Sequence, residues 1–121
     1  MQAILRLDGP ARARHFVKRV ADSQTAWSLW EDAGWALMEN DDRQQLFPLW
    51  PSREYAELLR MGDWARLEPR AIPLAELLED LLPKLSARGI LPAVFPTPSG
   101  KGATLTSAEL TALLQEELQK Y

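Results

Sequence analysis

The chain has 121 residues, of which 46% are hydrophobic and 26% are charged, and its formal net charge at pH 7 is -3. This length fits one globular domain, residues 1–121, and the small negative charge gives no general attraction for nucleic acid or anionic lipid. Cysteine is absent, which excludes disulfides and thiol chemistry, and His15 is the one histidine. No apolar run is long enough for a signal-peptide core or a membrane span. We therefore expect a cytoplasmic protein without nucleic-acid or membrane partners and without a cofactor.

The segment GPARARHFVKRVADSQ, residues 9–24, predicts an amphipathic helix of about four turns. The side chains that share its apolar face are Ala13, Phe16, Val17, Val20 and Gln24. The opposite face carries the densest positive cluster of the chain, Arg12, Arg14, His15, Lys18 and Arg19. One interpretation is an ordinary solvated helix face with a surface histidine, and the other is a docking surface for an anionic partner.

Three segments that follow, TAWSLWE, WALMEN and QQLFPLW, predict strands at residues 25–31, 35–40 and 44–50. Gly34 and the cluster Asn40, Asp41 and Asp42 supply turn residues between them, so we expect an antiparallel meander. Both faces of these strands are apolar, which indicates a sheet sandwiched between helices or covered by a partner chain, with a homodimer as one option. Pro48 favours an edge position or a bulge for the third strand.

The second half alternates helices and strands. WPSREYAELLRMG predicts a short helix with Ser52 as N-cap, and DWARLEPRAIPL predicts a strand around Trp64 and Leu67. LAELLEDLLPKLSARG predicts a long helix that Pro83 kinks or divides and that Gly89 ends. ILPAVFP and GATLT predict two more strands. We expect an α+β fold: an N-terminal helix, an antiparallel meander, then alternating helices and strands, with helices packed on a mixed or antiparallel sheet.

The last segment, TSAELTALLQEELQKY, predicts a closing helix. Thr106 and Glu109 have the spacing of a capping box at its start. Its apolar face contains Leu110, Leu113, Leu114 and Leu118, together with Glu117.

The SGKG of residues 99–102 raises the question of a phosphate-binding loop. Gly100 and Lys101 match a Walker A pattern, but Phe95 stands in place of its first glycine and Gly102 in place of its hydroxyl residue. The ATLT that follows favours a strand rather than a helix. We therefore interpret PTPSGKG as a tight connection between strands, with Lys101 at its tip as a candidate anion contact.

No set of residues predicts a catalytic or metal site. The adjacent carboxylates at residues 41–42, 79–80 and 116–117 have the pattern of solvating charge, and ENDDRQQ lacks the glycine and glutamate of a calcium loop. Five tryptophans are many for this length. Core packing is one interpretation, and an aromatic cleft bordered by Trp50 and Trp64 is the other.

The pieces VAD, GWALM, FPLWP with YAE, and AVFPTPSGKG occur in this order along the chain. This order resembles the bacterial family known as domain of unknown function 2750, which brings no activity with it. The second half is also similar to SseB-type domains, with Trp50, Pro51 and Ser52 in place of that family's Thr-Ser and Thr97 and Pro98 in place of its Asn-Pro. That similarity implies a small α/β interaction module rather than an enzyme.

The sequence therefore predicts a non-catalytic, cytoplasmic bacterial protein that binds another protein as an accessory, regulatory or immunity-type factor. The candidate surfaces are the basic face of Arg12, Lys18 and Arg19 and the cleft bordered by Trp50, Trp64 and Lys101. The alternative is a small-molecule or anion-binding protein, with hydrolysis as a further option, whose ligand lies in the loop of residues 99–102.

Overall fold

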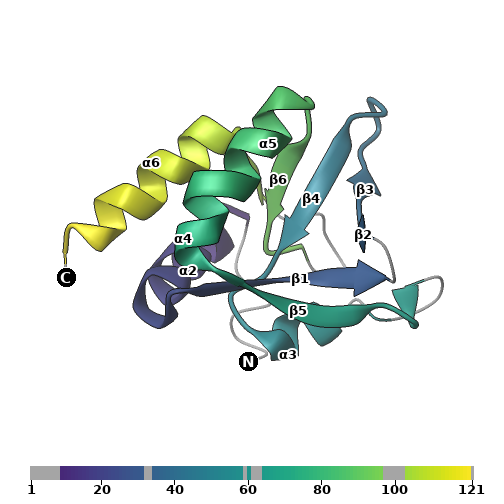
Figure 1. The fold of residues 1–121 in the computed structure, drawn as a ribbon, viewed down its shortest axis with the longest axis horizontal. Helices are drawn as coiled ribbons and strands as arrows, with labels where there is room; N and C mark the ends of the chain where they lie inside the picture. The colour runs from purple at the N-terminus through teal and green to yellow at the C-terminus, as the bar shows by residue number, and fades with distance from the viewer. Residues whose placement is uncertain (1–8, 32–33, 59, 61–63, 97–102, 121) are drawn as a thin grey trace.

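The computed structural model describes residues 9–31, 34–58, 60, 64–96 and 103–120 (Figure 1). It confirms the α+β class, with an N-terminal helix, antiparallel strand pairs, and then alternating helices and strands. The elements are α2 (Gly9–Ser23), β1 (Thr25–Glu31), β2 (Gly34–Trp35), β3 (Met38–Glu39), β4 (Gln45–Leu49), α3 (Arg53–Glu57), β5 (Glu68–Pro73), α4 (Leu74–Glu76), the π-helical turn η2 (Leu77–Leu81), α5 (Leu82–Ala87), β6 (Leu91–Val94), β7 (Ala103–Thr104) and α6 (Ser107–Leu118).

The strands form two sheets rather than one continuous meander. The first sheet is antiparallel in the order β2-β1-β5, and the second is mixed in the order β3-β4-β6-β7, with β4 and β6 parallel. The predicted strand at residues 35–40 is divided between them. The free edge of β1 is occupied at Trp27, which exchanges two backbone hydrogen bonds with Trp50 (2.9 and 2.8 Å). Because Trp50 occupies this edge at Trp27, β2 pairs only with the last two residues of β1. The chain then crosses to the second sheet.

Pro48 lies in a central strand, so the expected edge position is wrong for β4 as a whole. β3 pairs with Gln45 and Leu46 but does not extend as far as Pro48. On the side away from β6, the Pro48 carbonyl accepts a hydrogen bond from the buried Ser28 hydroxyl (2.6 Å). The missing proline donor therefore removes no hydrogen bond from a strand ladder.

The turn between β3 and β4 forms as the sequence predicts. The Asn40 side chain accepts hydrogen bonds from the backbone N–H groups of Asp42 (3.0 Å) and Gln44 (2.9 Å). Arg43 completes the turn with a φ of 63°, in the left-handed region.

The expected strand around Trp64 and Leu67 is wrong. Trp64 lies in a short helical turn in which the Leu67 N–H donates to the Trp64 carbonyl (3.1 Å), and the strand starts only at Glu68. α3 begins after Ser52 as expected, but the Ser52 side chain makes no capping hydrogen bond. The sequence pattern therefore predicted that a helix and then a strand occur here, but it placed the start of the strand too early.

The helix that contains Pro83 stays helical from Leu74 to Ala87, so its last turn is not divided. A π-helical turn, Leu77–Leu81, ends two residues before the proline. A proline ring crowds the carbonyl four residues earlier, here Glu79, and the wider π turn relieves that crowding. Gly89 ends the helix with a φ of 70°, as predicted.

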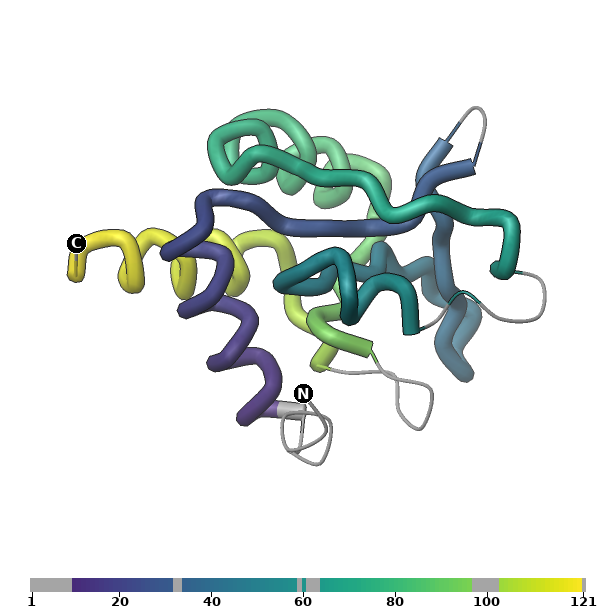
Figure 2. The backbone as a smooth tube through the Cα atoms, turned by 90° about the horizontal axis from the view of Figure 1, so that it is seen from below, coloured from purple at the N-terminus to yellow at the C-terminus, as the bar shows by residue number. Residues whose placement is uncertain are grey.

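The helices enclose one hydrophobic core with the two sheets. α5 contacts both β6 and α6, while α2 contacts α6 and β7 (Figure 1). The largest fully buried side chains are Trp50, Phe16, Phe47 and Phe95. Figure 2 shows α2 descending away from α6, so the two helices separate toward the N-terminal end of α2.

Candidate functional site: the groove between α2 and α6

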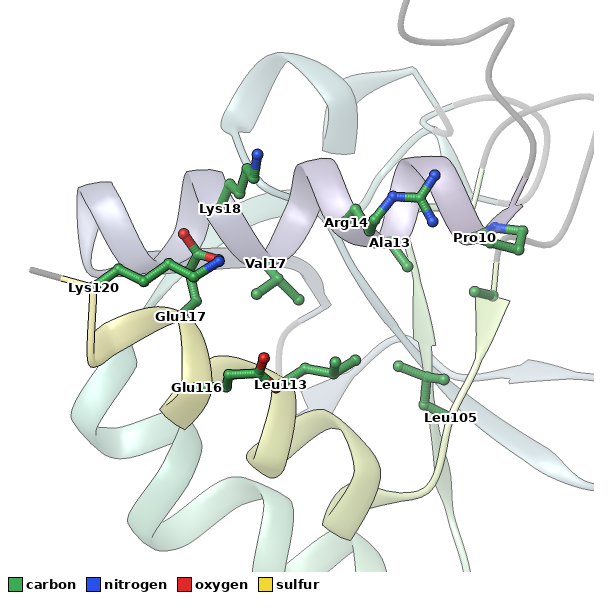
Figure 3. Close-up of a pocket in the computed structure, with 11 residues that line it drawn as sticks. Pro10, Ala13, Arg14, Val17, Lys18, Leu105, Leu113, Glu116, Glu117 and Lys120 are labelled. Atoms are coloured by element: carbon green, nitrogen blue, oxygen red, sulfur yellow. The ribbon is translucent and has the colours of Figure 1, made fainter.

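An open site lies where α2 and α6 separate. Its volume is about 410 Å³, and β7 with the residues after it closes one end (Figure 3). We call this site the α2–α6 groove, lined by Pro10, Ala13, Arg14, Val17, Lys18, Ala103, Leu105, Leu113, Glu116, Glu117 and Lys120.

The floor of the groove is apolar because of how each helix is fixed. In α2, Phe16 and Val20 are fully buried in the core, which leaves Ala13 and Val17 facing α6. In α6, the capping box predicted from the sequence forms, with Thr106 and Glu109 exchanging hydrogen bonds of 2.8 and 3.0 Å.

This register of α6 buries Leu110 and Leu114 completely and turns Leu113 outward. Leu113 was expected on the buried face, but it is 41% exposed and lies in the groove. A large apolar side chain is therefore left in contact with water at this site.

Charge is divided between the two walls. Arg14 and Lys18 stand one turn apart on α2, and Glu116 and Glu117 stand on α6 opposite them (Figure 3). Glu117 pairs with Lys120 at 3.2 Å and its side chain is only 13% exposed. Within the described part of the chain, Arg14, Lys18 and Glu116 take part in no ion pair. The groove thus offers two unpaired cations on one wall and one unpaired carboxylate on the other.

The predicted basic face is only partly exposed. Lys18 and Arg19 are exposed, but Arg12 is buried at 8% exposure, so its expected place on the basic face is wrong. The Arg12 Nε–H donates to the carbonyl of Phe95 (3.2 Å). Phe95 is fully buried and has a φ of 58°, a strained conformation for a side chain of this size. Arg12 is therefore a structural residue that holds the end of β6 against α2.

His15 is not the surface histidine expected from the sequence. Its ring packs against Phe95 (centroids 5.9 Å apart) and Tyr55 (6.4 Å). Its Nε2 atom is buried and has no hydrogen-bond partner among the described residues. Burial, with a smaller contribution from Arg19, lowers the pKa of His15.

The predicted aromatic cleft is not formed around Trp50. Trp50 is fully buried, and its Nε1–H donates to the carbonyl of Pro96 (2.8 Å). Trp64 is half-buried beside Trp35 and Arg66 at a different, shallower hollow. Lys101 and the loop of residues 99–102 lie outside the described residues, and so does the ligand site expected there. The structure therefore does not join Trp50 and Trp64 in one site.

A second cavity, of about 580 Å³, lies between the sheets and the helix that contains Pro83. It is lined in part by Trp30, Trp35 and Phe47, an aromatic cluster that sequence patterning did not identify. The guanidinium of Arg70 lies 4.2 Å from the centre of the Trp30 ring, and Asp80 on the rim pairs with Lys84 at 3.2 Å. Glu76 and Arg88 also line this cavity and form no ion pair with a described residue.

The described residues include no group of three or more His, Asp or Glu side chains arranged to hold a metal ion. Of the helices in these ranges, none is both long enough and apolar enough to cross a membrane.

Comparison with known families identifies a match. A family model described as "Protein of unknown function (DUF2750)" matches residues 13–114, which confirms the resemblance drawn from the sequence. No curated protein and no solved structure matches the chain. The similarity of the second half to SseB-type domains stays a prediction.

Proposed function

The chain belongs to the DUF2750 family, and we propose that its role is to bind a polypeptide in the α2–α6 groove. The observation that carries this proposal is the combination of an exposed Leu113 with unpaired charges of opposite sign on the two walls. An apolar strip rimmed by polar groups is typical of a protein-interaction surface.

The division of charge defines the surface that fits. The partner presents apolar side chains to Leu113, because covering this exposed leucine removes hydrocarbon from water, whereas Ala13 and Val17 are already buried in the monomer. On one flank it carries acidic groups that meet Arg14 and Lys18. On the other flank it carries a basic group that meets Glu116. Such complementary flanks select the partner and its orientation more than they add affinity.

Site-specific photo-crosslinking tests this proposal. A benzophenone amino acid replaces Leu113, and the matched control places it at Ala87, an exposed residue of α5 that lies outside the groove. We expect a polypeptide adduct at position 113 that the added substitution Lys18→Glu removes and that position 87 does not form. Peptide mapping of the adduct should find an apolar segment with an acidic flank.

Three results would contradict the proposal. The first is equal labelling at positions 87 and 113. The second is an adduct at position 113 that is not a polypeptide. The third is a polypeptide adduct whose yield does not change with Lys18→Glu.

We also propose a cytoplasmic location in a bacterium and an accessory, regulatory or immunity-type role, as expected from the sequence. The apolar groove supports a binding role of this kind but does not distinguish among the three. Cell fractionation of the tagged protein tests the location, and recovery in a membrane or extracellular fraction would contradict it.

A further inference from the structure

We infer that the polypeptide in the α2–α6 groove is a second copy of this chain, so that the protein forms a symmetric dimer; this inference rests on the proposed function. The groove has the same features that the proposed function requires of its partner, so two copies of it can bind each other. It has an apolar strip, a basic flank with Arg14 and Lys18, and an acidic flank with Glu116.

The charge distribution selects one symmetry axis. In a two-fold dimer the same patch faces itself, and the position of the axis decides which wall meets which. An axis that runs along the groove places the α2 wall of one copy against the α6 wall of the other. Lys18 of each copy then meets Glu116 of the other, twice in the dimer. An axis across the groove would instead set Lys18 against Lys18, and like charges brought together in this way repel.

The shape of the groove agrees with this axis. Leu113 projects from the α6 wall and is 41% exposed. With the axis along the groove, it packs against the α2 wall of the other copy, where Ala13 is small enough to leave room. Each copy thereby buries the exposed leucine of the other.

The size of the surface predicts a weak dimer. α2 has 15 residues and α6 has 12, so the face is roughly 20 Å long and about as wide. This is small beside a standard interface, which buries about 800 Å² on each partner. We therefore expect association that depends on protein concentration and weakens as salt screens the two ion pairs.

Charge exchange between copies tests the inference. Lys18→Glu and Glu116→Lys each put like charges at both contacts of the dimer. Sedimentation velocity over a concentration series should show the unmodified chain rising above its monomer mass of 13.7 kDa. Each variant alone should weaken association by about tenfold or more. An equal mixture of the two variants should recover dimers, because each of the two contacts then joins a glutamate of the Lys18→Glu variant to a lysine of the Glu116→Lys variant. Glu79→Lys, an exposed charge reversal outside the groove, is the control and should leave association unchanged.

The outcomes separate this inference from the proposed function. A chain that stays at monomer mass at every concentration overturns the second copy as partner, and so does a dimer that neither charge reversal weakens. Failure of the mixed variants to associate overturns the axis along the groove. In each of these cases, a crosslinked adduct of a different protein at position 113 would leave the proposed function standing.

Discussion

Lys18 on α2 and Glu116 on α6 lie on opposite walls of one groove, and neither forms an ion pair with a described residue (Figure 3). Both side chains are exposed and neither anchors the core. Surface charges of this kind contribute little to folding, so the two positions are available for recognition.

We therefore predict that Lys18→Glu and Glu116→Lys leave the monomer fold almost unchanged. The free energy of unfolding should change by less than about 0.5 kcal/mol for each variant, because exposed substitutions away from caps and cores have small effects. Urea denaturation at a concentration below that of any association measures this value. A loss of several kcal/mol would contradict this prediction, because it would show that these charges stabilise the monomer fold.

Arg12 should behave in the opposite way. We predict that Arg12→Ala lowers the free energy of unfolding by about 2 to 4 kcal/mol, because it removes a buried side chain and leaves the carbonyl of Phe95 without its donor. Arg14→Ala, two residues away and exposed, is the matched control and should change stability by less than about 0.5 kcal/mol. Equal effects of the two substitutions would contradict the structural role of Arg12. A variant that reverses Arg12, Lys18 and Arg19 together therefore tests folding rather than binding.

Trp50 should also be a stability residue. Trp50→Phe keeps a ring in the core but removes the Nε1 donor to Pro96 and leaves a small cavity, so we predict a loss of about 2 to 3 kcal/mol. Trp64→Phe, at a half-buried site, should cost less than about 1 kcal/mol. Thermal and urea unfolding of the two variants measure the difference. A cost at Trp64 equal to that at Trp50 would indicate that both belong to the core.

The sequence predicted the structural features that depend only on residues close together in the chain. The Thr106–Glu109 capping box, the positive φ of Gly89 and the turn around Asn40 form as expected, because each is decided within a few positions of the chain. The division of residues 35–40 between two sheets was not predicted. It depends on the pairing of Trp27 with Trp50 and of β1 with β5, which involve distant parts of the chain.

The candidate site was only partly predictable for the same reason. Lys18 was identified from a cluster of positive charge, which is a local pattern. The opposite wall comes from the other end of the chain, and the helical spacing in α6 placed Leu113 with the buried leucines. The packing of α6 against α2, α5 and β6 decides which of those leucines is left exposed. Arg12 was misassigned because a charged residue in a basic cluster gives no local sign that it is buried.

His15 should make the stability of the fold depend on pH. Its pKa is lowered from the ordinary value of 6.5, first because the ring is partly buried between Tyr55 and Phe95 and second because Arg19 is nearby. Between 6.5 and the lowered value, the unfolded chain binds a proton at this position and the folded chain does not. The free energy of unfolding should therefore fall as the pH falls through this window. It should be independent of His15 above the window and should level off below it.

Urea unfolding followed by tryptophan fluorescence, between about pH 5 and pH 8, measures the slope, for which one proton sets a ceiling of about 1.4 kcal/mol per pH unit. His15→Phe removes the titrating group but keeps a ring between Tyr55 and Phe95. We expect this variant to show a flatter profile in the same window, whatever its absolute stability. The capping hydrogen bonds lower the pKa of Glu109 from 4.5, and because both chains contain Glu109, the comparison with His15→Phe cancels its contribution. An unchanged slope in His15→Phe would show that another group is responsible for the pH dependence.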